Sequence, residues 1–133
     1  MRRAARRLPR GSVVVTGRFG DPPTVKLDRP DLPFLRFLER PRVHYPGIEL
    51  VADADVSVES DPYLDDHRFQ GQPLLPAVIG LEAMAQAAMA VAGSGEPPCF
   101  EDVSFDRPAV VPDGASITIR SAALVRASGR VEV

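Results

Sequence analysis

The chain has 133 residues, of which 44% are hydrophobic and 26% are charged, and its formal net charge is −2. This size and composition indicate one globular domain with its own core, and they exclude a chain that is disordered throughout. It has no hydrophobic run long enough for a bilayer, no secretory signal and a single cysteine, Cys99, so we expect a cytoplasmic protein with no membrane segment, disulfide or metal.

The N-terminal third begins with a basic segment and continues into a proline-rich one. Residues 1–10 contain five arginines and no acidic residue, so the rest of the chain is acidic, which argues against a nucleic-acid-binding domain. Residues 12–16 (SVVVT) are a β-branched run typical of a strand. Residues 21–46 contain six prolines and one possible helix at 32–39. We expect residues 1–46 to be a linker, or the end of a preceding domain, that lies as an arm over the surface.

The predicted domain spans residues 47–133 and contains three strand patterns. Residues 48–60 alternate between hydrophobic and polar side chains, as in a half-buried strand, and residues 116–125 show the same period. Ser128-Gly129 is expected to turn the chain into a last strand at 130–133. A strand that stops there leaves its next partner missing, so we expect a truncated piece that pairs with something through its sheet edge.

Residues 76–92 (PAVIGLEAMAQAAMAVA) predict a long helix that begins at a proline and ends at the following Gly-Ser-Gly. A surface helix has one hydrophobic stripe and one charged face, but Glu82 and Gln86 are the only polar side chains in this segment. We therefore expect the helix to be buried nearly all round by a sheet. No Ser, Thr, Asp or Asn caps its start, so its first N–H groups are expected to meet water or a ligand oxygen.

One histidine stands just before this helix. His67 precedes Gly71 by four residues and the helix start at Pro76 by nine. Histidine is the side chain whose ordinary pKa suits a general base near neutral pH. Glu82 adds a carboxylate on an otherwise hydrophobic helix, where charged groups are uncommon without a purpose. These residues are the candidates for catalysis.

The spacing of His67, Gly71 and Pro76 matches the HxxxGxxxxP motif, and through it the chain resembles the dehydratase domains of modular polyketide synthases and animal-type fatty acid synthases. Residues 61–66 (DPYLDD) are similar to the HPWLAD run that precedes the motif there. Asp61 departs from that run, because a histidine often stands at its position.

A second resemblance lies in residues 73–87 (PLLPAVIGLEAMAQA), which are similar to the helix of bacterial stand-alone β-hydroxyacyl-carrier-protein dehydratases. Compared with those, one extra residue separates the histidine from the first proline, and Ala77 stands where glycine is usual. The close likeness covers residues 55–92, and residues 105–112 (FDRPAVVP) resemble the polyketide dehydratases more loosely.

The resemblance implies an α+β hot-dog fold, in which an antiparallel sheet wraps a long central helix, here as the first half of a double hot dog. It implies removal of water from a β-hydroxyacyl thioester on the phosphopantetheine of an acyl carrier protein, with no cofactor bound by the domain itself. His67 would take the C2 proton, a carboxylic acid would protonate the C3 hydroxyl, and N–H groups near Gly71 and Pro76 would bind the thioester carbonyl. The acid is either Glu82 of a homodimer or a residue of the missing second half. The implied partners are the carrier protein, neighbouring synthase domains and a second hot dog.

Three other functions stay open at this point. A hot-dog acyl thioesterase uses a carboxylate and water and does not need His67. A product-template-like cyclase shares the histidine and the fold. A docking or structural domain of a large synthase would carry a degenerate site and have no activity.

Overall fold

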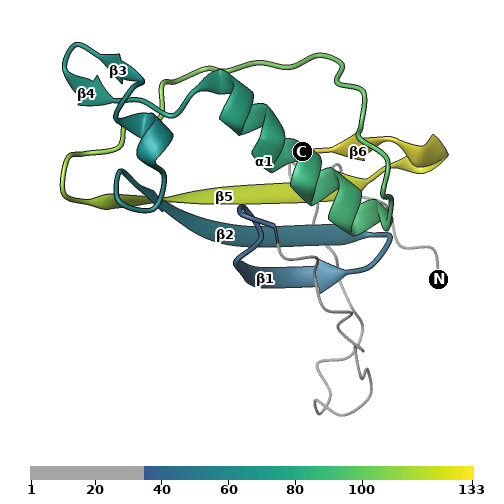
Figure 1. The fold of residues 1–133 in the computed structure, drawn as a ribbon. Helices are drawn as coiled ribbons and strands as arrows, with labels where there is room; N and C mark the ends of the chain where they lie inside the picture. The colour runs from purple at the N-terminus through teal and green to yellow at the C-terminus, as the bar shows by residue number, and fades with distance from the viewer. Residues whose placement is uncertain (1–34) are drawn as a thin grey trace, which may run out of the picture.

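The computed structural model describes residues 35–133, in which one helix lies across an antiparallel sheet (Figure 1). The elements in chain order are β1 (Arg40–Tyr45), β2 (Glu49–Ser57), a 3-10 turn (Pro62–Leu64), β3 (Arg68–Phe69), β4 (Gln72–Pro73), α1 (Ala77–Ala92), β5 (Ser116–Val125), a second 3-10 turn (Ala127–Gly129) and β6 (Val131–Glu132). The main sheet has the order β1-β2-β5-β6, and β3 and β4 form a separate hairpin. The predicted combination of one long helix and an antiparallel sheet is thus confirmed.

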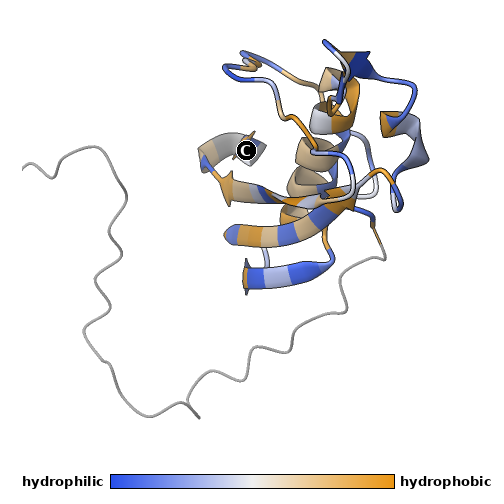
Figure 2. Ribbon diagram, turned by 90° about the vertical axis from the view of Figure 1, so that its left-hand side faces the viewer, coloured by the Kyte–Doolittle hydropathy of each residue, from blue (hydrophilic) through white to orange (hydrophobic). Residues whose placement is uncertain are grey.

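The central pair, β2 and β5, follows the alternation of the sequence. Leu50, Ala52, Ala54 and Val56 of β2 are fully buried, and the residues between them point to the other face of the sheet. β5 pairs antiparallel with all of β2, from Ser116 opposite Ser57 to Leu124 opposite Glu49. Figure 2 shows hydrophobic and hydrophilic residues alternating along these strands below the mostly hydrophobic helix.

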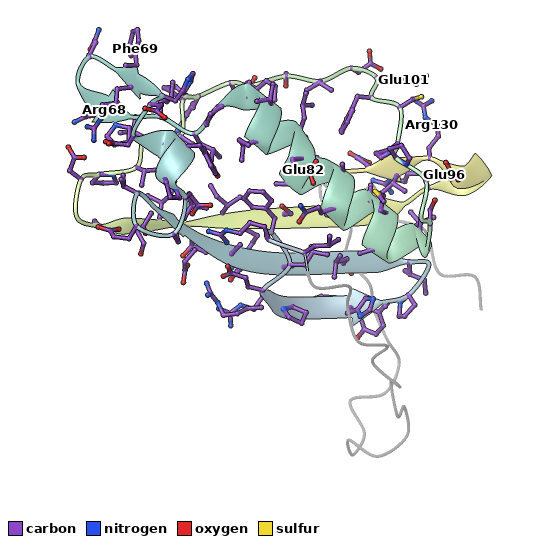
Figure 3. The ribbon with its side chains drawn as sticks, in the orientation of Figure 1. Arg68, Phe69, Glu82, Glu96, Glu101 and Arg130 are labelled. Carbon is purple, nitrogen blue, oxygen red and sulfur yellow. The ribbon has the colours of Figure 1, made fainter. Side chains whose placement is uncertain are left out.

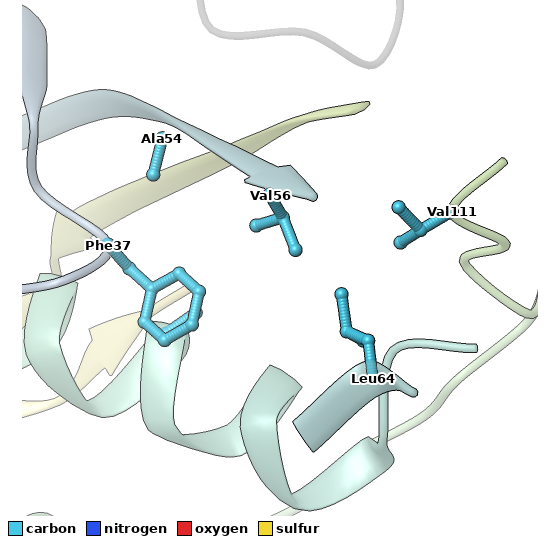
Figure 4. Close-up of a cluster of buried hydrophobic side chains, with 6 residues drawn as sticks. Phe37, Ala54, Val56, Leu64 and Val111 are labelled. Atoms are coloured by element: carbon cyan, nitrogen blue, oxygen red, sulfur yellow. The ribbon is translucent and has the colours of Figure 1, made fainter. Parts of the chain in front are cut away.

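The core lies between the sheet and α1 in two clusters. The first contains Phe37, Ala54, Val56, Leu64, Ala83 and Val111 (Figure 4). The second contains Leu38, Leu50, Ala52, Ala87, Val91 and Ala123. Because Leu64 packs in the first cluster, the loop after β2 is held against the core. This contact fixes the segment that leads to His67.

Helix α1 begins and ends as its sequence predicts. Pro76 precedes it in an extended conformation and makes no side-chain cap, and Gly93 ends it with a φ of 64°, which glycine adopts without strain. The expected burial on nearly all sides is wrong for this chain by itself. The sheet covers one face, whereas Val78 is 67% exposed and Glu82 is exposed.

Two predictions for the N-terminal part need correction, and one falls outside the structure. The sheet begins before the predicted boundary at residue 47, because β1 forms a hairpin with β2. Pro41 within β1 and Pro46 just after it concealed this strand in the sequence, but Pro41 is tolerated because β1 lies at the sheet edge. Residues 35–39 form a turn rather than part of a helix. The predicted strand at 12–16 lies outside the described residues.

Candidate functional site

His67 lies on the segment between β2 and α1, and hydrogen bonds hold its backbone on both sides. Its N–H donates to the carbonyl of Leu64 at 3.2 Å, and its carbonyl accepts the N–H of Leu74 at 2.9 Å. Leu74 is two residues before Pro76, so these contacts keep His67 next to the start of α1. The side chain itself is exposed.

Gly71 forms the turn of the β3–β4 hairpin that follows His67. Gln70 and Gly71 have φ values of 52° and 81°, the left-handed pair that a tight two-residue hairpin turn requires. Glycine adopts this conformation without the clash that a Cβ introduces. The spacing between His67 and Gly71 therefore has a local cause, since the turn directs the chain back past His67 to Leu74.

Arg68 fastens this hairpin to two neighbouring segments. It donates to the carboxylate of Asp65 at 2.6 Å, to that of Asp113 at 3.0 Å and to the carbonyl of Gly71 at 3.0 Å. The hydrogen bond that Arg68 donates to Asp113, and then the one it donates to Asp65, raise the pKa of Arg68 above its ordinary value. Arg68 and Phe69 project from the hairpin in Figure 3, and Phe69 is 63% exposed.

Asp61 begins the segment that leads to His67, and it is only 2% exposed. Arg36 binds both of its carboxylate oxygens, at 3.0 and 2.6 Å, and the hydroxyls of Ser60 and Tyr63 donate to it at 2.7 and 3.2 Å. Burial alone would raise the pKa of Asp61, but the hydrogen bonds from Arg36 and Ser60 outweigh it and hold this pKa below its ordinary value. Partial burial and the neighbouring Asp61 raise the pKa of Tyr63 to about 12.

Glu82 lies in the middle of α1, away from the hairpin that carries Arg68 (Figure 3). Its carboxylate accepts a hydrogen bond from the side-chain amide of Gln86 at 2.8 Å. The amide oxygen of Gln86 in turn accepts the backbone N–H of Phe37 at 2.9 Å. Because an N–H only donates, this contact fixes which side of the Gln86 amide faces Glu82. One oxygen of Glu82 is held by Gln86, and no hydrogen bond joins Glu82 to His67 in the structure.

The start of α1 keeps the open character that its sequence predicts. The carbonyl of Pro76 accepts the N–H groups of Ile79 and Gly80 at 3.0 and 3.1 Å, and no side chain caps the helix. The N–H groups of the first helical turn point out of the helix with the positive end of its dipole. This end of the helix is suited to bind a carbonyl oxygen or an anion.

A cleft of about 520 Å³ lies at the other end of α1, between the helix, residues 94–104 and β6. Met84, Met89 and Phe100 are among the residues that line it. Glu96, Glu101 and Arg130 gather there in Figure 3, and Arg130 donates to Glu101 at 3.1 Å. None of the predicted site residues lines this cleft.

The motif spacing predicts that His67, Gly71 and Pro76 lie close together. The structure places them around the β3–β4 hairpin and the start of α1. It places Glu82 elsewhere on the same helix. Sequence reasoning missed Arg36 and Arg68, which hold this region together. Asp61 departs from the related run at its position, but neither this departure nor its neighbours in the sequence show that it is buried against Arg36.

Residues 35–133, the part of the chain that the structure describes, lack two features. No group of three or more His, Cys, Asp or Glu side chains there could hold a metal ion. No helix in the same part of the chain is long and hydrophobic enough to cross a membrane.

Comparison with known proteins gives three matches. Residues 39–133 match the family described as polyketide synthase dehydratase domain. The polyketide synthase ThaG of Burkholderia thailandensis is 42% identical over 60 residues, which are 42% of this chain and 1% of ThaG. The 3-hydroxyacyl-acyl-carrier-protein dehydratase FabZ of Symbiobacterium thermophilum is 35% identical over 105 residues, which are 73% of this chain and 72% of FabZ. The chain thus spans about 1% of the length of ThaG and most of the length of FabZ.

Proposed function

Because the chain belongs to the polyketide synthase dehydratase domain family and is related to FabZ, we propose that it removes water from a β-hydroxyacyl thioester to give the α,β-enoyl thioester. The reaction is that of a lyase. The observation that carries the proposal is the position of His67, which is fixed by its backbone beside the uncapped start of α1. The proposed base, His67, and the N–H groups that would bind the substrate carbonyl therefore lie on consecutive segments of the chain. That carbonyl becomes an enolate when the proton leaves.

In this proposal His67 removes the proton from C2 of the substrate. Its ring is exposed and so open to an acyl chain from outside the domain. As the proton leaves, negative charge develops on the thioester oxygen, and preorganised N–H groups stabilise such a charge. The proposed donors are the first-turn N–H groups after Pro76 and a backbone N–H near Gly71.

The second part of the reaction needs an acid to protonate the leaving C3 hydroxyl. Glu82 is one candidate, and Gln86 would orient it through the hydrogen bond to one carboxylate oxygen. Because Glu82 lies in the middle of α1, away from the hairpin that follows His67, it would act on the His67 site of a second copy. The other candidate is a carboxylate on a second hot dog.

We favour the second hot dog, which makes this chain the first half of a double hot dog. Phe69, Val78 and Phe105 support this choice, because their hydrophobic side chains are 63%, 67% and 50% exposed around the hairpin and the helix start. A second hot dog packed there would cover them and would turn the open surface at His67 into a closed site.

The substrate would be carried on the phosphopantetheine of an acyl carrier protein, and the domain would need no cofactor of its own. The name of FabZ includes an acyl-carrier-protein substrate, and ThaG is a polyketide synthase, which supports a carrier protein and synthase domains as partners. We also propose that the protein works in the cytoplasm.

The test compares the full-length protein that carries this chain with its His67→Ala variant, on one β-hydroxyacyl thioester. Loss of a general base commonly lowers the rate about 10²–10⁴-fold, and we expect the variant to lose dehydration to that extent. The 133-residue chain alone and its Glu82→Gln variant separate the two acids. If Glu82 is the acid, the chain alone is active and the variant is not, whereas an acid on a second half leaves both nearly inactive.

The same assay distinguishes the alternative functions. Release of the free acid without loss of water would indicate a thioesterase, and ring closure without loss of water would indicate a cyclase. A full-length His67→Ala protein that dehydrates at the wild-type rate would refute the proposed mechanism.

A further inference from the structure

A partly buried ion pair between Arg36 and Asp61 lies upstream of His67 and joins two segments that are 25 residues apart in the sequence. Arg36 holds the carboxylate of Asp61 with two hydrogen bonds, the fork geometry that matches guanidinium to carboxylate. The same guanidinium also donates to the carbonyl of Asp55 in β2 at 2.5 Å. Asp61 is therefore connected, through Arg36, to the turn before β1 and to the interior strand β2.

From Asp61 a continuous series of hydrogen bonds leads to His67. The carbonyl of Asp61 accepts the N–H of Leu64 at 3.0 Å, and the carbonyl of Leu64 accepts the N–H of His67 at 3.2 Å. The Leu64 side chain is fully buried in the core, which fixes the middle of the series. The carbonyl of His67 then accepts the N–H of Leu74, just before α1.

The exposed His67 ring has no core packing to hold it, so its position depends on this backbone. We infer that Arg36 and Asp61 are positioning residues for His67: their ion pair sets where the segment 61–67 stands, and through it where the imidazole meets the substrate. The inference rests on the proposed function of His67 as the base. Misplacing a catalytic group by about 1 Å is enough to lower a rate about a hundredfold.

The competing explanation is that the pair stabilises the fold and nothing more. The chain offers a matched control for it, since Asp53 is also buried, at 1% exposure, and is also held by arginines, Arg42 at 2.8 Å and Arg120 at 2.7 Å. That network lies on the face of the sheet opposite α1 and shares no hydrogen bond with residues 61–67. Asp61→Asn and Asp53→Asn therefore remove equivalent charges, of which only one is joined to His67.

The first readout is amide hydrogen exchange of the 133-residue chain, which does not depend on catalysis. In Asp61→Asn we expect the amides of Leu64, His67 and Leu74 to exchange at least about tenfold faster than in the wild type, measured relative to the amide of Ala88 in the second half of α1, away from both networks. In Asp53→Asn this ratio stays unchanged. Arg36→Lys keeps the positive charge but removes the two-hydrogen-bond geometry of the guanidinium, so we expect a smaller increase in the exchange rates of the same three amides. This variant replaces Asp61→Asn if Asp61→Asn does not fold.

The second readout is the dehydration rate of the full-length protein. For Asp61→Asn we expect kcat to fall about 10- to 100-fold with KM nearly unchanged, and for Asp53→Asn we expect kcat to stay within about twofold. Equal effects of the two substitutions on exchange and kcat, or no effect of Asp61→Asn, would overturn the inference. Faster exchange at the three amides in a protein whose wild type does not dehydrate would overturn the proposed function instead, and leave the link between Asp61 and the His67 segment standing.

Discussion

Gly71 has two roles that need to be separated. In the sequence it is part of the HxxxGxxxxP spacing, and in the structure it occupies a left-handed position in the hairpin turn with a φ of 81°. An added Cβ would meet no atom within 4 Å, so space does not explain the glycine. The backbone conformation does, because a side chain in the left-handed region clashes with its own backbone.

We predict that Gly71→Ala destabilises the protein by about 1–2 kcal/mol, the usual cost of a left-handed conformation for a residue with a Cβ. The matched control is Gly95→Ala, because Gly95 also has nothing within 4 Å of its Cβ position but does not have a positive φ. Urea unfolding of both variants measures the difference. Equal free energies of unfolding for the two variants would show that the turn conformation is not what requires glycine.

At the scale of single residues, the sequence predicted local relations better than distant ones. His67, Gly71 and Pro76 are joined by one turn and a few backbone hydrogen bonds, so their spacing alone placed them together. Arg36 is 25 residues before Asp61, and nothing in the local sequence of either shows that they meet. The proposed catalytic acid has the same difficulty, because our proposal places it on a second hot dog or a second copy.

Gly80 lies inside α1 although glycine has a low helix propensity, and its close contact with Phe105 explains why a glycine occurs there. A Cβ on Gly80 would lie 2.9 Å from a ring carbon of Phe105. Glycine in a helix interior is about 1 kcal/mol less favourable than alanine, so close packing of the Phe105 ring offsets part of that cost. Phe105 lies in the long connection between α1 and β5, so this contact holds that connection against the helix.

We predict that the effect of Gly80→Ala depends on residue 105. In the wild type the gain in helix propensity is offset because the ring must move, and the free energy of unfolding changes little. In a Phe105→Ala background the ring is gone, and the same substitution stabilises the protein by about 1 kcal/mol. A double-mutant cycle by urea unfolding measures the coupling, and the same effect of Gly80→Ala in both backgrounds would contradict the contact.

Strand β2 carries a second ion-pair network on the face away from α1. Arg120 of β5 and Arg42 of β1 both bind Asp53, so this carboxylate connects three strands. The hydrogen bonds from Arg120 and then from Arg42 hold the pKa of Asp53 well below its ordinary value. In the unfolded chain Asp53 takes up a proton near pH 4, whereas in the folded protein it stays ionised to a lower pH.

The stabilisation from Asp53 is therefore fully present above about pH 4 and is lost as the pH falls towards the lower, folded-state pKa. We predict that Asp53→Asn lowers Tm at pH 7 and that the difference from the wild type shrinks at pH 3. Asp66→Asn is the control, because Asp66 is exposed and makes no ion pair in the described part of the chain. A Tm difference for Asp53→Asn that is the same at both pH values would contradict this account.

At the scale of elements, periodicity predicted the strands β2 and β5 and the helix α1 because each has a regular burial pattern over many residues. β1 was missed since prolines occupy residues 41 and 46 and a register irregularity between Pro41 and Val43 breaks its alternation. The burial of α1 was overestimated for a related reason. A hydrophobic helix shows how much surface must be covered, but not whether the covering strands belong to the same chain.

Strand β5, in the interior of the main sheet, is paired along only part of the side that faces β6. Among residues 35–133, β6 pairs with β5 only at Leu124 and Val125, although β5 extends back to Ser116. The cleft beside α1 is lined by Val131 of β6, the edge strand, and by Val133 after it, which is 43% exposed. Unpaired strand edges next to hydrophobic surface bind further strands.

We predict that the 133-residue chain associates through this edge, so that its average mass in solution rises with concentration. A lysine at Val133, next to the edge strand β6, opposes strand addition, because an added strand would bury its charge. Val133→Lys should therefore shift association to higher concentration. Ile48→Lys places the same charge on a side chain that is 60% exposed in the β1–β2 turn, away from this edge, and should leave association unchanged. Multi-angle light scattering over a concentration series measures all three proteins, and a wild-type chain that stays monomeric at the highest concentration would show that the open edge recruits no partner strand.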